Sequence, residues 1–181
     1  MIITISGKAG SGKSTIAKIL SKRLGLKHYS VGDVMRKMAA EKGIPVLELN
    51  KMAEKDKSID LELDSRLKIL GKTEDNFVID GRLTAYFIPN AEARVFLSAK
   101  DKVRAQRIMK DKRIQEKSKS LKEMIGSIGK REESEKKRYK GYYNVDYTKK
   151  KLYNCIIDTT NLSPDEVVGK IMKFIKYQKS L

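Results

Sequence analysis

The stretch from Ile2 to Thr15 constrains the fold most, because a short apolar run leads directly into a glycine-rich segment that ends in a lysine and two hydroxyl residues. The segment fits the pattern G-x-x-x-x-G-K-[ST], with Gly7, Gly12, Lys13 and Ser14 at the required positions. Glycines let backbone N–H groups turn inward around an anion that a Cβ would crowd out, and the helix that follows adds its dipole. The stretch therefore predicts a strand, a phosphate-binding loop and a helix.

This loop predicts binding of a nucleoside triphosphate. Lys13 can reach the β- and γ-phosphates, and Ser14 can place its hydroxyl on Mg²⁺. An ordinary glycine-rich turn is the simpler alternative, but the complete motif between a strand and a helix argues against it. The residues expected around the ATP phosphates are Gly7, Lys8, Ala9, Gly10, Ser11, Gly12, Lys13, Ser14 and Thr15.

Length and composition limit the remaining possibilities. A chain of 181 residues suits one α/β domain with a substantial core. The lone Cys155 and the single His28 exclude a disulfide framework, a cysteine-based zinc cluster and a histidine-rich metal site. Cys155 lies in an apolar run and is expected to be a buried core thiol. No signal-like N-terminus and no run of 18 apolar residues is present, so we expect a soluble cytoplasmic protein without membrane contact.

The charge of the chain allows two interpretations. The formal net charge is +17, which is typical of nucleic-acid binding but also of enzymes that handle phosphates. From Lys100 to Lys151 there are 19 Lys and Arg against 8 Asp and Glu. Few apolar residues anchor this stretch, so we expect it to be exposed and mobile. Charge alone does not decide between the two interpretations.

The pattern of apolar residues predicts strands alternating with helices, which indicates a parallel sheet. The helical pair between the second and third strands is expected to be a small module that covers the substrate. Strands are expected at Ile2 to Ser6, Lys27 to Ser30, Asn76 to Asp80, Ala93 to Ala99 and Cys155 to Asp158. Helices are expected at Lys13 to Leu24, from a cap near Gly32 or Asp33 to Gly43, at Pro45 to Lys55, Ile59 to Leu70, Asp101 to Met109, much of Ser118 to Tyr139, and Pro164 to Tyr177, with Gly141 to Tyr147 as a loop.

A small kinase is the activity that these elements favour. The chain lacks the guanine-reading motif N/T-K-x-D, and motor or helicase ATPases usually need a longer chain. Phosphoryl transfer needs arginines around the acceptor phosphate and an acid for Mg²⁺ or its water shell. Asp80 and Arg82 follow a buried strand at its carboxyl end, where parallel sheets keep their ligands. Asp80 could instead cap the turn, and further arginines suited to a phosphate are Arg36, Arg131 and Arg138.

Six segments, GKAGSGKST, SVGDVMR, VIDGR, VRAQRI, REESEKKRY and IIDTT, together resemble the cytidylate kinases, in particular the short archaeal type of this nucleoside monophosphate kinase family. The resemblance implies a P-loop NTPase three-layer α/β sandwich with a five-stranded parallel sheet of order 2-3-1-4-5. It implies one kinase domain over 1–181, with a core at 1–43, 73–110 and 152–181, an acceptor-binding module at 44–72 and a lid at 111–151. It also implies ATP with Mg²⁺ as donor, and CMP, with dCMP, as acceptor.

The resemblance also implies roles for individual residues. Ser30, Asp33 and Arg36 would face the monophosphate pocket, where Asp80 and Arg82 resemble the acceptor-site acid and arginine, the acid lying near Mg²⁺. Arg107 resembles the arginine that packs on the adenine of ATP. In the R-E-x-x-E-x-x-R pattern, Arg131, Glu135 and Arg138 resemble lid residues that reach the transferring phosphates and the acceptor, and helical spacing puts them on one face. The expected catalytic residues are Lys13, Arg131 and Arg138, and the expected metal-binding residues are Ser14 and Asp80, the latter directly or through water.

Several alternatives stay open. The motif GD-x-x-R resembles adenylate kinases as well, and residues 44–72 are shorter than the bacterial insert, so contacts to cytosine are not assigned. Other small P-loop kinases, adenylate kinase-like or acting on dephospho-coenzyme A, are the alternatives among enzymes. A P-loop RNA-binding protein is the alternative from another class, but the tyrosines of the basic stretch form no obvious stacking platform. No specific nucleic acid is therefore expected, and a monomer is favoured.

Overall fold

In the computed structural model, which describes residues 1–44, 46–111, 120–178 and 180, the chain forms one five-stranded parallel sheet. Its order, β2-β3-β1-β4-β5, confirms the expected topology. The central strand is buried along its whole length, as expected for a parallel sheet covered on both faces. The strands are β1 (Ile2–Gly7), β2 (Lys27–Ser30), β3 (Phe77–Asp80), β4 (Ala93–Ser98) and β5 (Cys155–Asp158).

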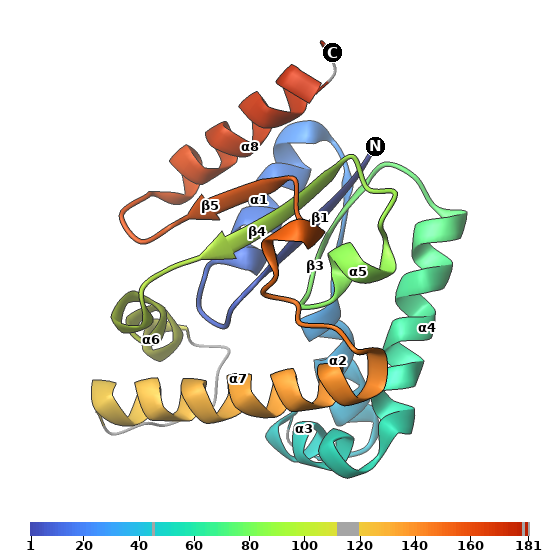
Figure 1. The fold of residues 1–181 in the computed structure, drawn as a ribbon, viewed down its shortest axis with the longest axis vertical. Coiled ribbons are helices and arrows are strands. Elements are labelled where there is room, and N and C mark those ends of the chain that lie inside the picture. Colours follow the sequence, from blue (N-terminus) through green and yellow to red (C-terminus); the bar gives the residue numbers. More distant parts are fainter. Residues whose placement is uncertain (45, 112–119, 179, 181) are drawn as a thin grey trace.

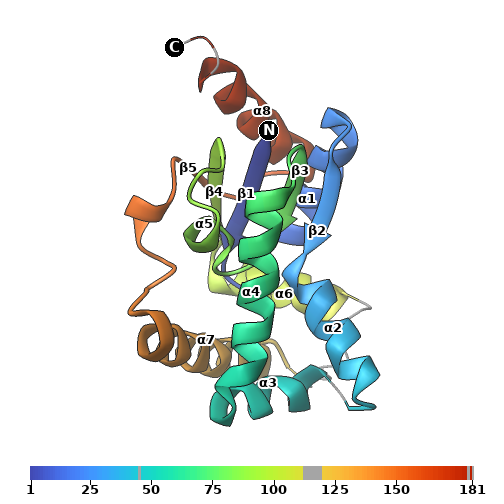
Figure 2. The same cartoon turned by 90° about the vertical axis from the view of Figure 1, so that its right-hand side faces the viewer.

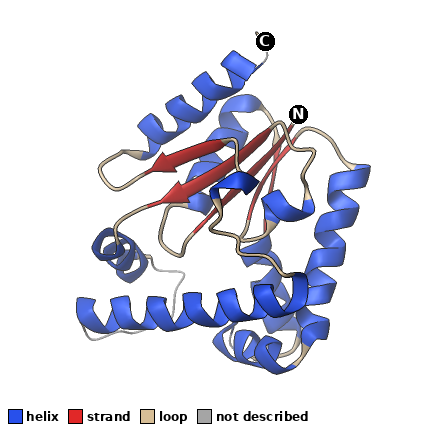
Figure 3. Ribbon diagram, viewed as in Figure 1, coloured by secondary structure: helices blue, strands red, loops and turns tan. Residues whose placement is uncertain are grey.

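Helices cover both faces of the sheet and give three layers (Figures 1 and 3). On one face, α1 (Lys13–Leu24) and α8 (Pro164–Gln178) pack with strand residues such as Ile3 and Ile5. On the other face, Ile2 and Phe96 belong to a cluster that includes residues of α4 (Lys57–Thr73) and α5 (Thr84–Phe87). The segment that leads through the 3-10 helix η1 (Lys150–Leu152) to β5 packs on the same side. Cys155 is buried as expected.

Three helices lie between β2 and β3 (Figure 2), whereas the expected excursion from the sheet consisted of the last two alone. They are α2 (Val31–Glu41), α3 (Val46–Lys55) and α4, and they share a small core that contains Met38, Leu49 and Leu63. Asp56 alone separates α3 from α4 and caps α4 by accepting from the backbone N–H of Ser58 at 2.9 Å. The expected start of the third helix at Pro45 lies outside the described residues.

The cap of α2 was predicted wrongly. Ser30, not Gly32 or Asp33, is its N-cap residue, with an extended backbone. The Ser30 hydroxyl makes no cap hydrogen bond and instead donates to Asp80 at 3.3 Å. The helix therefore begins directly at the end of β2, which places Ser30 next to the carboxyl end of β3.

Most described residues of the basic stretch are exposed, as expected, but one stripe of its long helix is buried. After α6 (Asp101–Lys110), the long helix α7 (Leu121–Tyr143) crosses the carboxyl end of the sheet (Figure 1). Its buried residues include Met124 and Ile128 near α6, and Tyr139 on the sheet side. One apolar stripe within a lysine-rich sequence is sufficient to dock the helix. Positions 112–119 of the expected lid lie outside the described residues.

The predicted loop at 141–147 starts later than expected. Helix α7 continues to Tyr143 and ends at Asn144, which adopts the left-handed conformation with φ 52°. Tyr147 is buried and joins Tyr139 and Tyr153 in the core. Aromatic side chains therefore hold the segment after α7 against the sheet. Within the described residues, no helix combines the length and apolar character needed to cross a membrane.

Candidate phosphate-transfer site

The glycine-rich loop lies where β1 ends beside β3 and β4. Two of its glycines are required by close backbone contacts. A Cβ on Gly7 would lie 2.2 Å from the carbonyl oxygen of Leu97, and one on Gly10, where φ is 73°, would lie 2.5 Å from that of Arg104. Both distances are too short for any other residue. The loop is therefore held tightly against β4 and the first turns of α6.

Lys13 lies at the start of α1 and turns back over the loop. Its Nζ donates to the carbonyl oxygen of Lys8 at 2.9 Å. Burial, reinforced by the nearby Arg82 guanidinium, lowers the pKa of Lys13 well below its ordinary value. An anion bound in the loop would offset this effect by stabilising the charged ammonium group. The electrostatic environment thus favours arrival of a negatively charged ligand.

Asp80, at the carboxyl end of β3, collects hydrogen bonds from two neighbouring elements. Strand pairing sets Asp80 beside Ile5 of β1 and Ser30 of β2. Its Oδ2 accepts from the hydroxyl of Ser14 at 2.7 Å, and its Oδ1 lies 2.9 Å from His28 Nε2. The structure therefore brings Ser14, Ser30 and Asp80 together as a set of oxygen atoms at the end of the phosphate loop.

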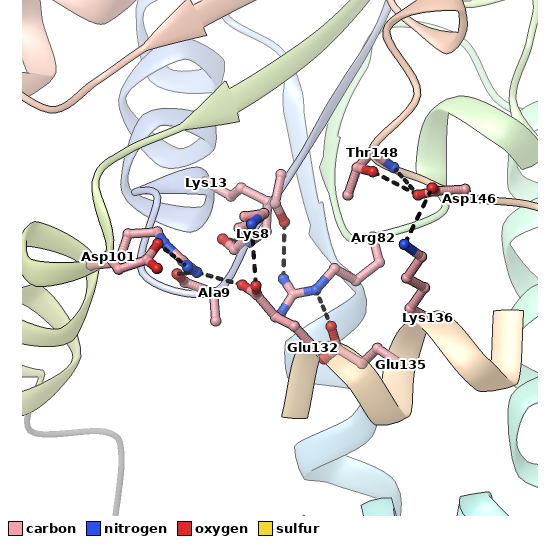
Figure 4. A network of polar contacts seen from close by, with 12 residues as sticks. Lys8, Ala9, Lys13, Arg82, Asp101, Glu132, Glu135, Lys136, Asp146 and Thr148 are labelled. Carbon is pink, nitrogen blue, oxygen red and sulfur yellow. Dashed lines mark hydrogen bonds and ion pairs between the residues drawn. The ribbon is translucent and has the colours of Figure 1, made fainter. Parts of the chain in front are cut away.

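Arg82, Arg131, Lys13 and Glu135 form what we call the phosphate cluster; Figure 4 labels Lys13, Arg82 and Glu135. The Arg82 guanidinium donates to the two carboxylate oxygens of Glu135 at 2.8 and 3.2 Å, and to the carbonyl oxygen of Gly7 at 3.1 Å. Arg131 Nε donates to the same carboxylate at 3.1 Å. Burial opposes ionisation of Glu135, but Arg82 and Arg131 outweigh burial and bring the pKa of this carboxyl down to about 2.

A second network, which we call the loop clamp, consists of Lys8, Asp101, Arg104 and Glu132. Arg104 is buried and donates to the carbonyl oxygen of Ala9 at 3.0 Å, to Asp101 at 2.7 Å and to Glu132. Glu132 also pairs with Lys8 Nζ at 3.3 Å. The clamp therefore connects the tip of the phosphate loop to both α6 and α7 (Figure 4).

The balance of basic and acidic side chains differs between the loop clamp and the phosphate cluster, and this difference indicates different roles. The loop clamp contains two cations and two carboxylates, so its members neutralise one another. The phosphate cluster contains three basic side chains and one carboxylate, and although the Asp80 carboxylate at the end of β3 also acts on Lys13, the basic side chains outnumber the carboxylates. Excess positive charge in a buried site attracts an anion. The phosphate cluster is thus suited to bind phosphates, and the clamp is suited to hold the loop in place.

Other residues expected to contact the acceptor have different neighbours. Arg36 pairs with Asp33 on the exposed side of α2, and its guanidinium lies against Gly32. Arg138 lies 3.4 Å from Asp60 of α4 rather than next to Arg82. Arg107 donates to the Thr159 hydroxyl at 2.9 Å and to its carbonyl oxygen at 2.7 Å, beside the loop that follows β5. Their expected contacts with nucleotides stay predictions.

Three features of this region were not predicted from the sequence. Arg104 and Glu132 lie inside two of the quoted motifs, yet only the fold shows that they meet. His28 was considered only as evidence against a metal site, and it contacts Asp80. Asp60 and Asp64 are buried acids one helical turn apart on α4. In the sequence, the available signal was the spacing of these two acids, which places both on one face of a helix. Carboxylates that are buried usually have a specific partner.

Fold and site together define a P-loop protein of the small-kinase architecture. The structure is similar to shikimate kinase from Bacteroides thetaiotaomicron, with a TM-score of 0.70 and 16% identity over 97% of this chain and 98% of that one. It is also similar to shikimate kinase from Aquifex aeolicus, with a TM-score of 0.61 and 19% identity over 100% and 99% of the two chains. At such low identity these likenesses concern the fold alone.

The chain belongs to the cytidylate kinase-like family, whose model matches residues 2–161. Relatives described as cytidylate kinase include one from Methanobrevibacter smithii, 40% identical over 97% of this chain and 99% of the relative. The corresponding protein of Sulfurisphaera tokodaii is 38% identical over 98% and 96% of the two chains. That of Archaeoglobus fulgidus is 38% identical over 99% and 97%. The resemblance noted in the sequence is thereby confirmed.

Proposed function

We propose that this protein transfers the γ-phosphoryl group of ATP to CMP, and also to dCMP, giving ADP and the nucleoside diphosphate. The observation that carries the proposal is the phosphate cluster, in which Lys13, Arg82 and Arg131 gather around a complete phosphate-binding loop with one carboxylate among them. Membership of the cytidylate kinase-like family supports the choice of acceptor.

The chemistry needs little from the protein beyond position and charge. An oxygen of the acceptor monophosphate attacks the γ-phosphorus, and the bond from that phosphorus to the β,γ-bridging oxygen breaks, which releases ADP. The attacking oxygen is already anionic, so no side chain has to act as a strong general base. Lys13 and Arg131 would neutralise the charge that develops between donor and acceptor. Helix α7 lies over the carboxyl end of the sheet, where it would exclude water from the reacting groups (Figure 1).

The residues near Asp80 fit a magnesium ion. Mg²⁺ binds proteins through one or two carboxylates and otherwise keeps water and substrate phosphate oxygens as ligands. Among the described residues, no group of three or more His, Cys, Asp or Glu is placed to hold a metal ion. Ser14 and Asp80, hydrogen-bonded at 2.7 Å, would hold Mg²⁺ directly or through water. When bound, the ion would neutralise charge on the ATP phosphates.

An ADP-release assay with ATP and Mg²⁺ tests the proposal directly. The acceptors to compare are CMP, dCMP, UMP, AMP and dephospho-coenzyme A. CMP should give the highest kcat/KM, with dCMP next. Turnover with AMP or dephospho-coenzyme A alone would assign the protein to one of the other small kinases. ADP release that needs no acceptor would contradict phosphoryl transfer.

Arg36 allows a test of the acceptor site in a variant that should fold. Its ion pair with Asp33 is exposed, so Arg36→Ala should change stability by less than about 1 kcal/mol. If the guanidinium binds the acceptor phosphate, the substitution should raise the KM for CMP by about tenfold and leave the KM for ATP nearly unchanged. Arg66→Ala, which breaks a comparable exposed pair with Glu62 on α4, is the matched control. Equal effects on both substrates would remove Arg36 from the acceptor site.

A further inference from the structure

His28 is the single histidine of the chain, and its side chain lies at the carboxyl end of the sheet, beside the residues suited to magnesium. It belongs to β2, two positions before Ser30, and Ser30 is paired with Asp80 of β3. Side chains two positions apart on a strand point to the same face of the sheet. His28 and Ser30 therefore reach the Asp80 carboxylate from the same face, as their contacts with it show.

The two oxygens of the Asp80 carboxylate have different partners. Oδ1 lies 2.9 Å from His28 Nε2, whereas Oδ2 accepts from the Ser14 hydroxyl at 2.7 Å and from the Ser30 hydroxyl at 3.3 Å. An ionised carboxylate can only accept hydrogen bonds, so His28 Nε2 carries the hydrogen in this contact. The histidine therefore occupies one oxygen of Asp80, and the other oxygen lies beside Ser14.

The contact between His28 and Asp80 is shielded from water. Their side chains are 17% and 3% exposed, and a carboxylate buried to this degree needs hydrogen bonds. Rotation about the last carbon–carbon bond of an aspartate side chain is broad and roughly twofold. The hydroxyls of Ser14 and Ser30 alone could therefore bond either oxygen in turn. The imidazole removes this freedom, because it holds Oδ1 in one direction with a hydrogen bond to a charged acceptor.

The hydrogen bond from His28 is not needed to join β2 to β3. The two strands are paired in parallel at four positions, from Lys27 opposite Phe77 to Ser30 opposite Asp80. The Ser30 hydroxyl adds a side-chain contact to the same carboxylate. A histidine that served only to pair the strands would repeat these contacts. What His28 adds to them is the direction of the Asp80 carboxylate.

We propose that His28 is a positioning residue for magnesium, which orients Asp80 so that its Oδ2 stays beside Ser14, where the ion would bind. The inference rests on the proposed function, in which Ser14 and Asp80 hold Mg²⁺. Carboxylates that bind metals are held by residues that do not touch the metal, and loss of such a hydrogen bond typically lowers metal affinity by about 10–100-fold. Mg²⁺ depends on this orientation because it requires nearly ideal octahedral geometry.

The test measures how strongly Mg²⁺ assists the binding of ADP. Calorimetric titration with ADP gives one dissociation constant in EDTA and another in Mg²⁺, and the ratio of the first to the second is the coupling of metal and nucleotide. His28→Phe keeps a planar ring without the donor, and it should lower this ratio by about tenfold or more while the constant in EDTA stays nearly unchanged. His28→Gln should restore most of the ratio, because its amide N–H can donate in place of Nε2.

Tyr29→Phe is the matched control on the same strand. It removes a hydrogen bond of 2.8 Å from the Tyr29 hydroxyl to Glu74, on the opposite face of β2, and it should leave the ratio unchanged. Thermal melting of each variant checks folding, and His28→Ala gives the same comparison if His28→Phe does not fold. In the kinase assay, the Mg²⁺ concentration that gives half-maximal turnover should rise in His28→Phe, whereas the KM for CMP should not.

The outcomes separate this proposal from the proposed function. An equal ratio in the original protein and in folded His28→Phe would overturn the role of His28, while the kinase function would stand. His28→Gln as impaired as His28→Phe would also overturn it, because the donor would not be the cause. ADP binding that is equal in EDTA and Mg²⁺ in the original protein would remove the magnesium site and the role of His28 with it. If the ratio falls in His28→Phe but the original protein phosphorylates no acceptor, the role of His28 stands and the proposed function fails.

Discussion

Removal of the Glu135 carboxylate would leave the Arg82 guanidinium buried, with the Gly7 carbonyl as its one remaining hydrogen-bond partner among the residues that the structure describes. The two side chains are 6% and 13% exposed and share two hydrogen bonds. Breaking such a buried pair from one side costs about 3–5 kcal/mol. In a protein of this size, each kcal/mol lowers the melting temperature by about 2–4 °C. Glu135→Ala should therefore melt about 6–20 °C below the unaltered protein at pH 7.

Two further variants show whether charge causes this loss. Glu135→Gln keeps one accepting oxygen for Arg82, so it should lose less, about 1.5–3 kcal/mol. Glu62→Ala breaks an exposed pair with Arg66 and should cost less than about 1 kcal/mol. Melting curves at pH 7 for the three variants should therefore rank with Glu135→Ala lowest, Glu135→Gln in between and Glu62→Ala near the original.

The pH dependence provides a second measurement on the same variants. The pKa of Glu135 is about 2 in the folded protein against an ordinary 4.5. A depressed pKa contributes stability that is present above about pH 4.5 and is lost as the pH falls toward 2. The difference in unfolding free energy between the original protein and Glu135→Gln should therefore shrink across this range. A pH-independent difference, or a Glu135→Ala melting temperature equal to that of Glu62→Ala, would refute the reasoning.

Three other predictions concern separate parts of the molecule. Lys13→Ala should lower turnover by about a thousandfold or more, because a cation is lost at the transferring phosphoryl group. Lys18→Ala, on the exposed side of α1, should leave turnover unchanged. Near-normal turnover in folded Lys13→Ala would exclude this role for Lys13. Gly126→Ala and Gly129→Ala should each stabilise α7 by about 0.5–1 kcal/mol in melting experiments, since a Cβ there meets nothing within 4 Å; destabilisation would contradict the helix assignment. Burial raises the pKa of Asp64 to about 6 from an ordinary 3.8, so the stability contributed by its protonated form is lost as the pH rises from about 4 to 6. The Asp64→Asn variant lacks this loss and should gain about 1–2 kcal/mol of unfolding free energy relative to the original protein across that window. Parallel curves of stability against pH for the two proteins would disprove this prediction.

Local sequence was sufficient for the parts of the site that one segment builds alone. The loop motif identifies its own glycines, and the buried run before Asp80 places that acid at the end of a strand beside the loop. The strand order required the family resemblance as well, because spacing within a strand does not say which strand is its neighbour. Both kinds of information are carried by short stretches of sequence.

Contacts between distant segments could not be predicted in the same way. Arg82 and Glu135 are 53 positions apart, and although the resemblance implies that both reach the acceptor, neither segment indicates that they pair with each other. The docking of α7 was missed because its apolar residues are few and its lysines many. Only the packing on α6 and the sheet shows that a narrow buried stripe is sufficient. The partners of Arg104 and Arg138 likewise depend on how the helices pack. Which arginine serves which phosphate is therefore a question of tertiary structure.

The central position of β1 affects how the chain can be synthesised and folded. β1 leaves the ribosome before either of its neighbours, β3 and β4, has been made, and the apolar face that α8 covers waits for residues 164–178. Helix α1 can cover part of that face as soon as it has been made, but the rest of the sheet face stays uncovered, or shielded by other proteins, until α8 follows. A chain that stops after β5 would have a complete sheet with one face only partly covered, and such a fragment should aggregate rather than fold.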